Sequence, residues 1–279
     1  MKREATPQQA PVATGVINGT AYSVHGAGEP VVLVHGVGME QAVWTRQLAC
    51  LASEYQVIVY DLLGHGASQD PPEDARLAHY GQQLKMLLDH LEIESAAIVG
   101  QSMGALVTLE FALTYPERTR KIATVNAVFM RTPEQREAVL ARARTLREVG
   151  VAATLDSTIE RWFGNPVPAE LQADADLVAG FMKRAHPAGY ARSYQLFASA
   201  DAAHAEGLAR LAVPALFMTG EFDPNSSPAM SEAMARLAPN SSVEIIEGAR
   251  HMMVLTSAER VNQALLAFLK KPHAVAATE

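Results

Sequence analysis

The sequence predicts an α/β protein built on a mostly parallel sheet, and three observations support this prediction. Short continuous apolar runs, such as residues 31–35 and 57–61, are typical of strands that are covered on both faces. Helical stretches alternate with these runs, as expected for βαβ units and a parallel sheet. The segment Gly-Gln-Ser-Met-Gly at residues 100–104 lies between an apolar run, residues 96–99, and a helical stretch, residues 105–111.

Length, charge and cysteine content limit the classes of protein to which this chain can belong. A chain of 279 residues with 49% hydrophobic residues can bury a large core in one or two domains. Its net charge of −7 and its lack of Lys/Arg runs argue against a nucleic-acid or anionic-membrane partner. The one cysteine, Cys50, excludes an internal disulfide framework, and we expect it to be a small core residue on an amphipathic helix.

The chain also lacks the apolar segments that targeting and membrane insertion require. Its first residues carry charge with no apolar stretch behind them, unlike a standard secretory signal. No run approaches the ~20 apolar residues of a membrane span. We therefore expect a cytoplasmic protein with a small-molecule substrate; a homodimer remains open.

The predicted elements begin with a hairpin. Asn18-Gly19 between strand-like residues predicts a tight turn and an antiparallel edge over residues 16–22. The remaining strands are expected at residues 31–35, 57–61, 96–99, 122–125, 215–218 and 243–246, and the closing helix at residues 257–269.

The alternation breaks between residues 129 and 203, where the pattern predicts helices alone. Thr132-Pro133-Glu134 is typical of an N-cap followed by proline at the first helical position. Helix ends are expected at Gly150 and Gly164, and helix starts near Pro168 and Pro187. Tyr190, Tyr194 and Phe197 recur at helical spacing and share one face, which either packs on the domain below or lines a substrate pocket.

Ser102 is the candidate nucleophile. In a strand-to-helix turn as tight as residues 99–105, flanking glycines keep Cβ atoms away from the close chain crossing. The serine is then held in a strained conformation, with its hydroxyl projecting from the sheet edge.

A serine hydroxyl needs a base, an acid that orients the base, and donors for the oxyanion. His251 follows the last predicted strand, so we expect it at the same sheet edge as Ser102 and assign it as general base. Asp223, after the preceding strand, is the expected acid; Glu221 is its competitor. Asn126 is uncharged and cannot stabilise an imidazolium as a carboxylate can.

Two backbone N–H groups are expected to form the oxyanion hole. Met103 follows the nucleophile at the start of its helix, and Val37 lies in the loop after residues 31–35, with Gly38 as the alternative donor. Two histidines, His35 and His65, lie in neighbouring loops, and we expect them to hold the backbone of these loops in place.

These segments resemble α/β-hydrolases over nearly the whole chain. The similarity rests on His-Gly-Val-Gly at residues 35–38, the stretch 61–68, Gly-Gln-Ser-Met-Gly, Gly-Glu-Phe-Asp-Pro at residues 220–224 and a late histidine. The resemblance implies an eight-stranded, mostly parallel sheet with a helical lid inserted after strand 6. On this basis we expect a core of residues 15–128 and 204–271, a lid of residues 129–203, and tails at residues 1–14 and 272–279.

Within that fold the chain resembles 3-oxoadipate enol-lactonases through Arg161-Trp162-Phe163, and meta-cleavage-product hydrolases through its Ser-Met-Gly turn. The resemblance implies a serine hydrolase that cleaves a small carboxylic ester or enol-lactone through an acyl-enzyme, without cofactor or metal. Met252, where the carbon–carbon hydrolases usually carry Trp, weakens that alternative. A slow ligand-binding receptor of the same fold is the third hypothesis.

An acidic substrate requires a cation near the pocket. The helical insert offers Arg131, Arg161, Arg184 and Arg192, and the sequence does not say which of them point inward. The pocket itself is expected to include Gly38, Trp162, Phe163, Tyr190, Tyr194 and Met252.

Overall fold

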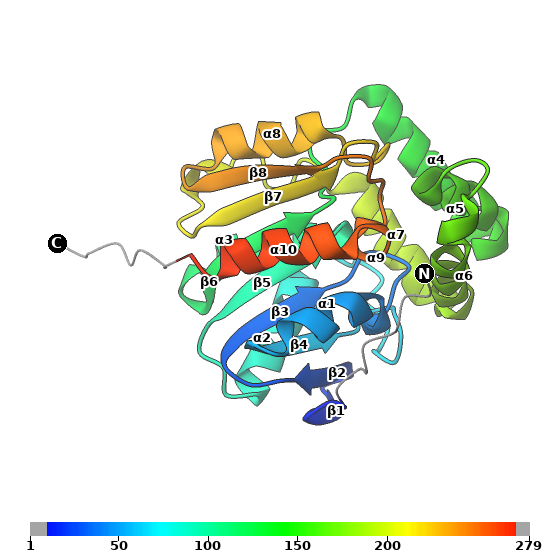
Figure 1. Cartoon of the computed structure of the whole chain (residues 1–279). Coiled ribbons are helices and arrows are strands. Elements are labelled where there is room, and N and C mark those ends of the chain that lie inside the picture. Colours follow the sequence, from blue (N-terminus) through cyan, green and yellow to red (C-terminus); the bar gives the residue numbers. More distant parts are fainter. Residues whose placement is uncertain (1–9, 272–279) are drawn as a thin grey trace.

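One eight-stranded sheet with helices on both faces forms the body of the protein (Figure 1). The computed structural model describes residues 10–271. The strands are β1 (Ala13–Ile17), β2 (Thr20–His25), β3 (Glu29–Val34), β4 (Tyr55–Tyr60), β5 (Ala96–Gln101), β6 (Thr119–Val125), β7 (Ala215–Gly220) and β8 (Ser241–Ile246). Their order is β1-β2-β4-β3-β5-β6-β7-β8, and all pairs from β4 to β8 are parallel. The predicted α/β-hydrolase architecture is confirmed.

The predicted hairpin forms the antiparallel edge. Asn18 and Gly19 join β1 to β2 with positive φ angles of 47° and 72°, which suits the right-handed twist of the two strands. Strand β1 begins at Ala13, so Ala13 and Thr14, which we assigned to the N-terminal tail, belong to the sheet. The rest of that predicted tail up to residue 9, and the predicted C-terminal tail 272–279, lie outside the described residues.

Helices pack on both faces of the sheet. They are α1 (Thr45–Leu51), α2 (Leu77–His90), α3 (Met103–Thr114), α8 (Pro228–Leu237), α9 (Met253–Thr256) and α10 (Ala258–Leu269). Helices α1 and α10 contact one another on one face, and α2 contacts α3 on the other (Figure 1). Within residues 10–271, no helix has the length and the apolar character that crossing a bilayer requires.

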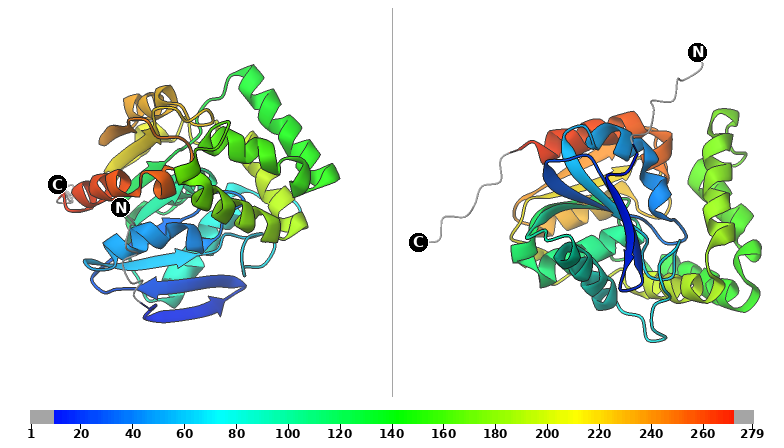
Figure 2. Two further views of the ribbon diagram at one scale, coloured as in Figure 1. Left: turned by 45° about the vertical axis from the view of Figure 1, so that its right-hand side comes forward. Right: turned by 90° about the horizontal axis from the view of Figure 1, so that it is seen from below.

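Four helices form an insert between β6 and β7, and they project beyond one end of the sheet (Figure 2). They are α4 (Pro133–Val149), α5 (Leu155–Phe163), α6 (Gln172–Arg184) and α7 (Pro187–Ser199). The expected caps are present: Thr132 accepts a hydrogen bond from the Gln135 N–H, and Gly150 and Gly164 follow their helices with positive φ. Helix α4 packs on α7, and α5 packs on α6.

The core follows the apolar runs of the central strands. Leu33, Ile58 and Val99 are fully buried, as expected for parallel strands covered on both faces. Cys50 is only half-buried, contrary to our prediction of a core residue. The buried face of α1 carries Leu48 and Leu51, and Cys50 lies at its margin.

Two buried histidines connect the loops that follow β3 and β4. His35 donates from Nδ1 to the Gly36 carbonyl (2.8 Å) and accepts at Nε2 from the Leu62 N–H (2.9 Å). His65 likewise contacts the Leu63 carbonyl through Nδ1 (3.0 Å) and accepts at Nε2 from the Gly38 N–H (2.9 Å). Each ring therefore needs one unprotonated nitrogen, so both rings are neutral.

Burial reinforces this neutral state. Loss of solvation lowers the pKa of His35 to about 4 and that of His65 to about 3, from an ordinary value near 6.5. The expected bracing role of both residues agrees with these contacts.

The two depressed pKa values predict acid-sensitive stability. Below pH ~6.5 the histidines of the unfolded chain bind protons, whereas the two buried histidines of the folded chain stay neutral. The free energy of unfolding therefore falls as the pH falls toward 4 and 3. Glutamine at position 65 keeps a hydrogen-bond acceptor but does not titrate. We therefore expect the free energy of unfolding of His65→Gln to fall by about 1 kcal/mol less per pH unit than that of wild type between pH 6 and 4.

Urea unfolding at a series of pH values measures this difference. His90→Gln provides the matched control because His90 is exposed at the end of α2. Equal slopes for wild type and His65→Gln would contradict the assignment of a neutral, buried His65.

Candidate active site

The turn between β5 and α3 is as tight as the glycine pattern predicts. A Cβ at Gly100 would lie 2.1 Å from the Gly104 carbonyl oxygen, and one at Gly104 would lie 2.2 Å from the Val34 carbonyl oxygen. Ser102 has φ 56° and ψ −113°, and its N–H donates to the Val125 carbonyl (2.8 Å). A non-glycine residue with positive φ is strained, and here the surrounding backbone leaves it no alternative.

His251 and Asp223 form a buried pair at the same sheet edge. His251 lies in the loop between β8 and α9, and its Nδ1 is 2.8 Å from the Asp223 Oδ2. The two side chains are 2% and 0% exposed. Glu221, the competing acid, accepts a hydrogen bond from the Gly248 N–H at the surface and does not contact the histidine.

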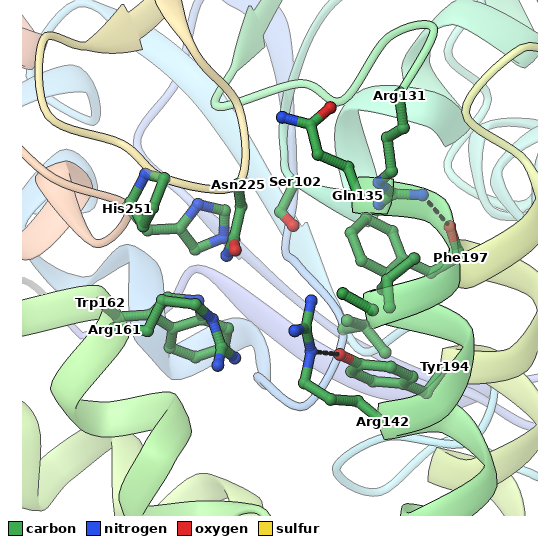
Figure 3. Close-up of a pocket in the computed structure, with 14 residues that line it drawn as sticks. Ser102, Arg131, Gln135, Arg142, Arg161, Trp162, Tyr194, Phe197, Asn225 and His251 are labelled. Carbon is green, nitrogen blue, oxygen red and sulfur yellow. Dashed lines mark hydrogen bonds between the residues drawn. The ribbon is translucent and has the colours of Figure 1, made fainter. Parts of the chain in front are cut away.

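Ser102 and His251 line one cavity of about 140 Å³, to which Val37 also contributes. Figure 3 shows the Ser102 hydroxyl between His251 on one side and Arg142 and Tyr194 on the other. The structure therefore brings together the predicted nucleophile and the predicted base, with the predicted acid behind the base.

The two predicted oxyanion donors also lie at this edge. Within residues 10–271, the Val37 N–H has no hydrogen-bond acceptor. Met103 is the first residue of α3, where N–H groups have no partner in their own helix. The structure does not support Gly38 as the alternative donor, because its N–H already donates to the His65 Nε2.

The cavity includes only two of the six residues that we predicted for the pocket, Trp162 and Tyr194. Phe163 and Met252 are instead buried in the core, and Tyr190 packs against Gly38, where its hydroxyl would meet an added Cβ at 2.9 Å. Gly38, Phe163, Tyr190 and Met252 are therefore not among the residues that line this cavity.

Trp162 lies against His251 on the pocket wall. Their ring centroids are 5.0 Å apart and their planes are inclined by 30° (Figure 3). The indole Nε1 is buried, and no acceptor for it is found in the described part of the chain.

Arginines also line the cavity. Of the four that we considered, Arg131 and Arg161 line the cavity, whereas Arg184 pairs with Glu40 (2.9 Å) and Arg192 contacts Pro71 and Glu73 outside it. Sequence reasoning missed a third cavity arginine, Arg142 on α4.

A helical period could have indicated Arg142. It lies three residues after Val139 and seven after Gln135, and all three line the cavity from one face of α4. The period alone does not say that this face covers a cavity.

The cavity arginines differ in their partners. Arg131 is held by Asp201 (3.5 Å) and by the carbonyls of Phe197 and Ala198. For Arg142 and Arg161, no carboxylate within residues 10–271 lies within ion-pair distance. Burial and the neighbouring charge of Arg142 lower the pKa of Arg161.

The site contains no arrangement suited to a metal. Across residues 10–271, no group of three or more His, Cys, Asp or Glu side chains is placed to hold one. The described chemistry is that of a hydroxyl, an imidazole, a carboxylate, backbone donors and guanidinium groups.

Comparisons with known proteins identify the family to which this fold belongs. The alpha/beta hydrolase fold family model matches residues 29–258. The chain is 35% identical over 249 residues to (E)-2-((N-methylformamido)methylene)succinate hydrolase from Acinetobacter baylyi, covering 89% of this chain and 93% of that protein. It is 29% identical over 255 residues to 3-oxoadipate enol-lactonase 2 from the same organism, covering 90% and 92%.

A solved structure is similar over a comparable length. The thermophilic esterase from Thermogutta terrifontis, with malate bound, has a TM-score of 0.84 and 29% identity, and the match covers 96% of this chain and all of that one. Fold, turn geometry and sequence similarity agree, and the chain belongs to the alpha/beta hydrolase fold family.

Proposed function

We propose that this protein is a serine hydrolase that cleaves a small carboxylic ester or lactone through an acyl-enzyme. The observation that carries the proposal is the buried His251–Asp223 pair at a cavity that also contains the strained Ser102. The similarity to an enol-lactonase and to an esterase supports the bond type.

In the proposed reaction, the Ser102 Oγ attacks the carbonyl carbon and its proton passes to the His251 Nε2. The Asp223 carboxylate stabilises the resulting imidazolium and holds its tautomer through Nδ1. The carbonyl oxygen, now an oxyanion, accepts hydrogen bonds from the Val37 and Met103 N–H groups.

Collapse of the intermediate breaks the bond to the leaving oxygen, which takes the proton from His251. In a lactone this alcohol stays attached to the acyl group, and in an enol-lactone it becomes a ketone. A water molecule, deprotonated by His251, then attacks the acyl-enzyme carbonyl. His251 returns this proton to the departing Ser102 oxygen, which releases the acid and the free hydroxyl of Ser102.

The charge of the cavity favours a substrate that carries its own carboxylate. Arg142 donates from Nε to the Tyr194 hydroxyl (3.3 Å), and Arg161 donates to the Ser157 carbonyl and the Thr158 hydroxyl. Two neighbouring guanidinium groups repel one another, and a carboxylate between them removes that repulsion while accepting charge-assisted hydrogen bonds.

Arg131 is a weaker candidate for this role, because Asp201 already balances its charge. The names of the relatives are consistent with an anionic substrate: one acts on a substituted succinate, and the similar esterase was solved with malate. We therefore assign Arg142 and Arg161 as the carboxylate subsite.

A second candidate function is hydrolysis of an amide. The relative at 35% identity is named for a substrate with an N-methylformamido group, in which the acyl carbon is bonded to nitrogen. The same serine chemistry applies, but the leaving nitrogen must be protonated by His251 before it departs.

The nucleophile can be tested by covalent labelling. A fluorophosphonate is expected to add mass to the peptide containing Ser102, and Ser102→Ala is expected to abolish both labelling and turnover of 4-nitrophenyl acetate. Ser231→Ala, at a buried serine on α8, is the matched control and should retain both. Labelling at another residue, or unchanged turnover in Ser102→Ala, would refute the assignment.

The carboxylate subsite predicts a charge-selective effect. Arg142→Met and Arg161→Met should each raise KM for mono(4-nitrophenyl) succinate about 10- to 100-fold, the equivalent of one charge-assisted hydrogen bond. The KM for the neutral ester 4-nitrophenyl butyrate should change by less than about twofold, because this ester has no carboxylate.

Arg184→Met is the control for this comparison, since Arg184 pairs with Glu40 outside the cavity. Equal losses on the charged and the neutral ester would mean that the arginines shape the cavity without binding a carboxylate.

The type of bond can be tested with a panel of carboxylate-bearing esters, lactones, N-acyl amides and ring-fission diketones. Because an alkoxide leaves more readily than an amide nitrogen, we expect kcat/KM for ester or lactone to exceed that of the matching amide at least ~100-fold. A faster amide would favour the second candidate. Cleavage of the diketone alone would select carbon–carbon hydrolysis, and tight binding without turnover would select a receptor.

A further inference from the structure

Asn126 occupies a strained position beside the candidate active site. It directly follows β6, is fully buried, and has a left-handed φ of 54°. Its N–H donates to the Met218 carbonyl (2.8 Å), and its carbonyl accepts from the Ser226 hydroxyl (2.8 Å). With both backbone groups held, the direction of its Cα–Cβ bond is fixed.

The side-chain amide contacts the same carboxylate oxygen that orients the base. Asn126 Nδ2 is 2.8 Å from the Asp223 Oδ2, which is also 2.8 Å from the His251 Nδ1. Both carboxylate oxygens are acceptors, so it is the NH₂ group of the amide that must face Asp223. The other oxygen of Asp223, Oδ1, accepts from the Asn225 N–H (2.8 Å).

This placement leaves one polar atom of the amide without a partner. The Asn126 Oδ1 is buried, and no donor to it is found among the described residues. A left-handed backbone and a buried, unsatisfied oxygen both oppose folding. The contact that Asn126 makes with Asp223 is thus retained against two local penalties, which is typical of a residue selected for its effect on a site.

We propose that Asn126 is a positioning residue, whose amide holds the Asp223 carboxylate in the orientation that His251 requires. This inference rests on the proposed function, because it assigns Asn126 an effect on the acid of that reaction. Asn126 is not among the residues lining the cavity, so its loss should lower kcat with little change in KM.

The shared oxygen has a second consequence. Because the side chain at position 126 and His251 contact one atom of Asp223, a carboxylate at position 126 would face that atom without a hydrogen to donate. Two ionised carboxylates at hydrogen-bond distance repel one another. Asn126→Asp would therefore remove the support of Asp223 without changing the shape of the side chain.

The experiment compares Asn126→Gly, Asn126→Asp and Asp223→Asn, with 4-nitrophenyl acetate as substrate. Glycine removes the amide and accepts the left-handed backbone without strain. We expect kcat of Asn126→Gly to fall about 10- to 100-fold with KM within about twofold, as for loss of a hydrogen bond to a charged group.

Asp223→Asn should lose about 10⁴ in kcat, the loss seen for the equivalent change in a serine protease triad. We expect Asn126→Asp to lower kcat at least about tenfold at pH 9, where the added carboxyl is ionised and repels Asp223. This substitution preserves side-chain shape, so the variant tests the proposal even if Asn126→Gly does not fold.

Asn18→Gly is the matched control, because it makes the same change at another left-handed asparagine, in the turn between β1 and β2. It should leave kcat and KM unchanged. Unaltered kcat in Asn126→Gly, or in a folded Asn126→Asp at pH 9, would overturn the proposal.

These outcomes are separable from failure of the proposed function. If Asp223→Asn loses activity and Ser102 is labelled while Asn126→Gly retains full kcat, only the role of Asn126 is refuted. If Ser102→Ala remains active, the proposed reaction itself fails, whatever the asparagine variants do.

Discussion

The close crossing of β5 and α3 is the constraint on which the site depends. There is no space for a Cβ at Gly100 or Gly104, because backbone carbonyls of the crossing chain segments lie within 2.2 Å of where it would be. This packing forces Ser102 into a left-handed conformation and directs its side chain away from the sheet into the cavity. The strain is offset by the extensive burial of the strand and the helix on either side of the turn.

Around that turn, polar groups are buried only where hydrogen bonds fix them. Asp223 is only 3% exposed, and His251, Asn126 and the Asn225 backbone N–H form hydrogen bonds with its carboxyl group. His35 and His65 stay neutral because each uses one ring nitrogen as an acceptor. Buried side chains thus hold the loops at the carboxyl edge of the sheet, and these loops carry the backbone donors near Ser102.

The insert differs from the sheet edge, because two of its arginines have no carboxylate partner among the described residues. Arg142 and Arg161 face one cavity from α4 and α5, and burial together with the charge of Arg142 lowers the pKa of Arg161. Two neighbouring guanidinium groups repel one another, and in the proposed function a substrate carboxylate removes that repulsion. In the proposed function, the sheet edge supplies the chemistry and the insert supplies the selection of substrate.

The sequence by itself determined the features that depend on neighbours along the chain or on strand order. The glycine-flanked turn, the Asn18-Gly19 hairpin and the helix caps are local. The placement of Asp223 and His251 near Ser102 follows because parallel strands end at one edge. Tertiary structure decided the rest: that Arg142 and not Arg184 faces the cavity, that Tyr190 and Met252 are core, and that Asn126 contacts Asp223. Helical periodicity defines a face, but only packing against distant segments determines what that face covers.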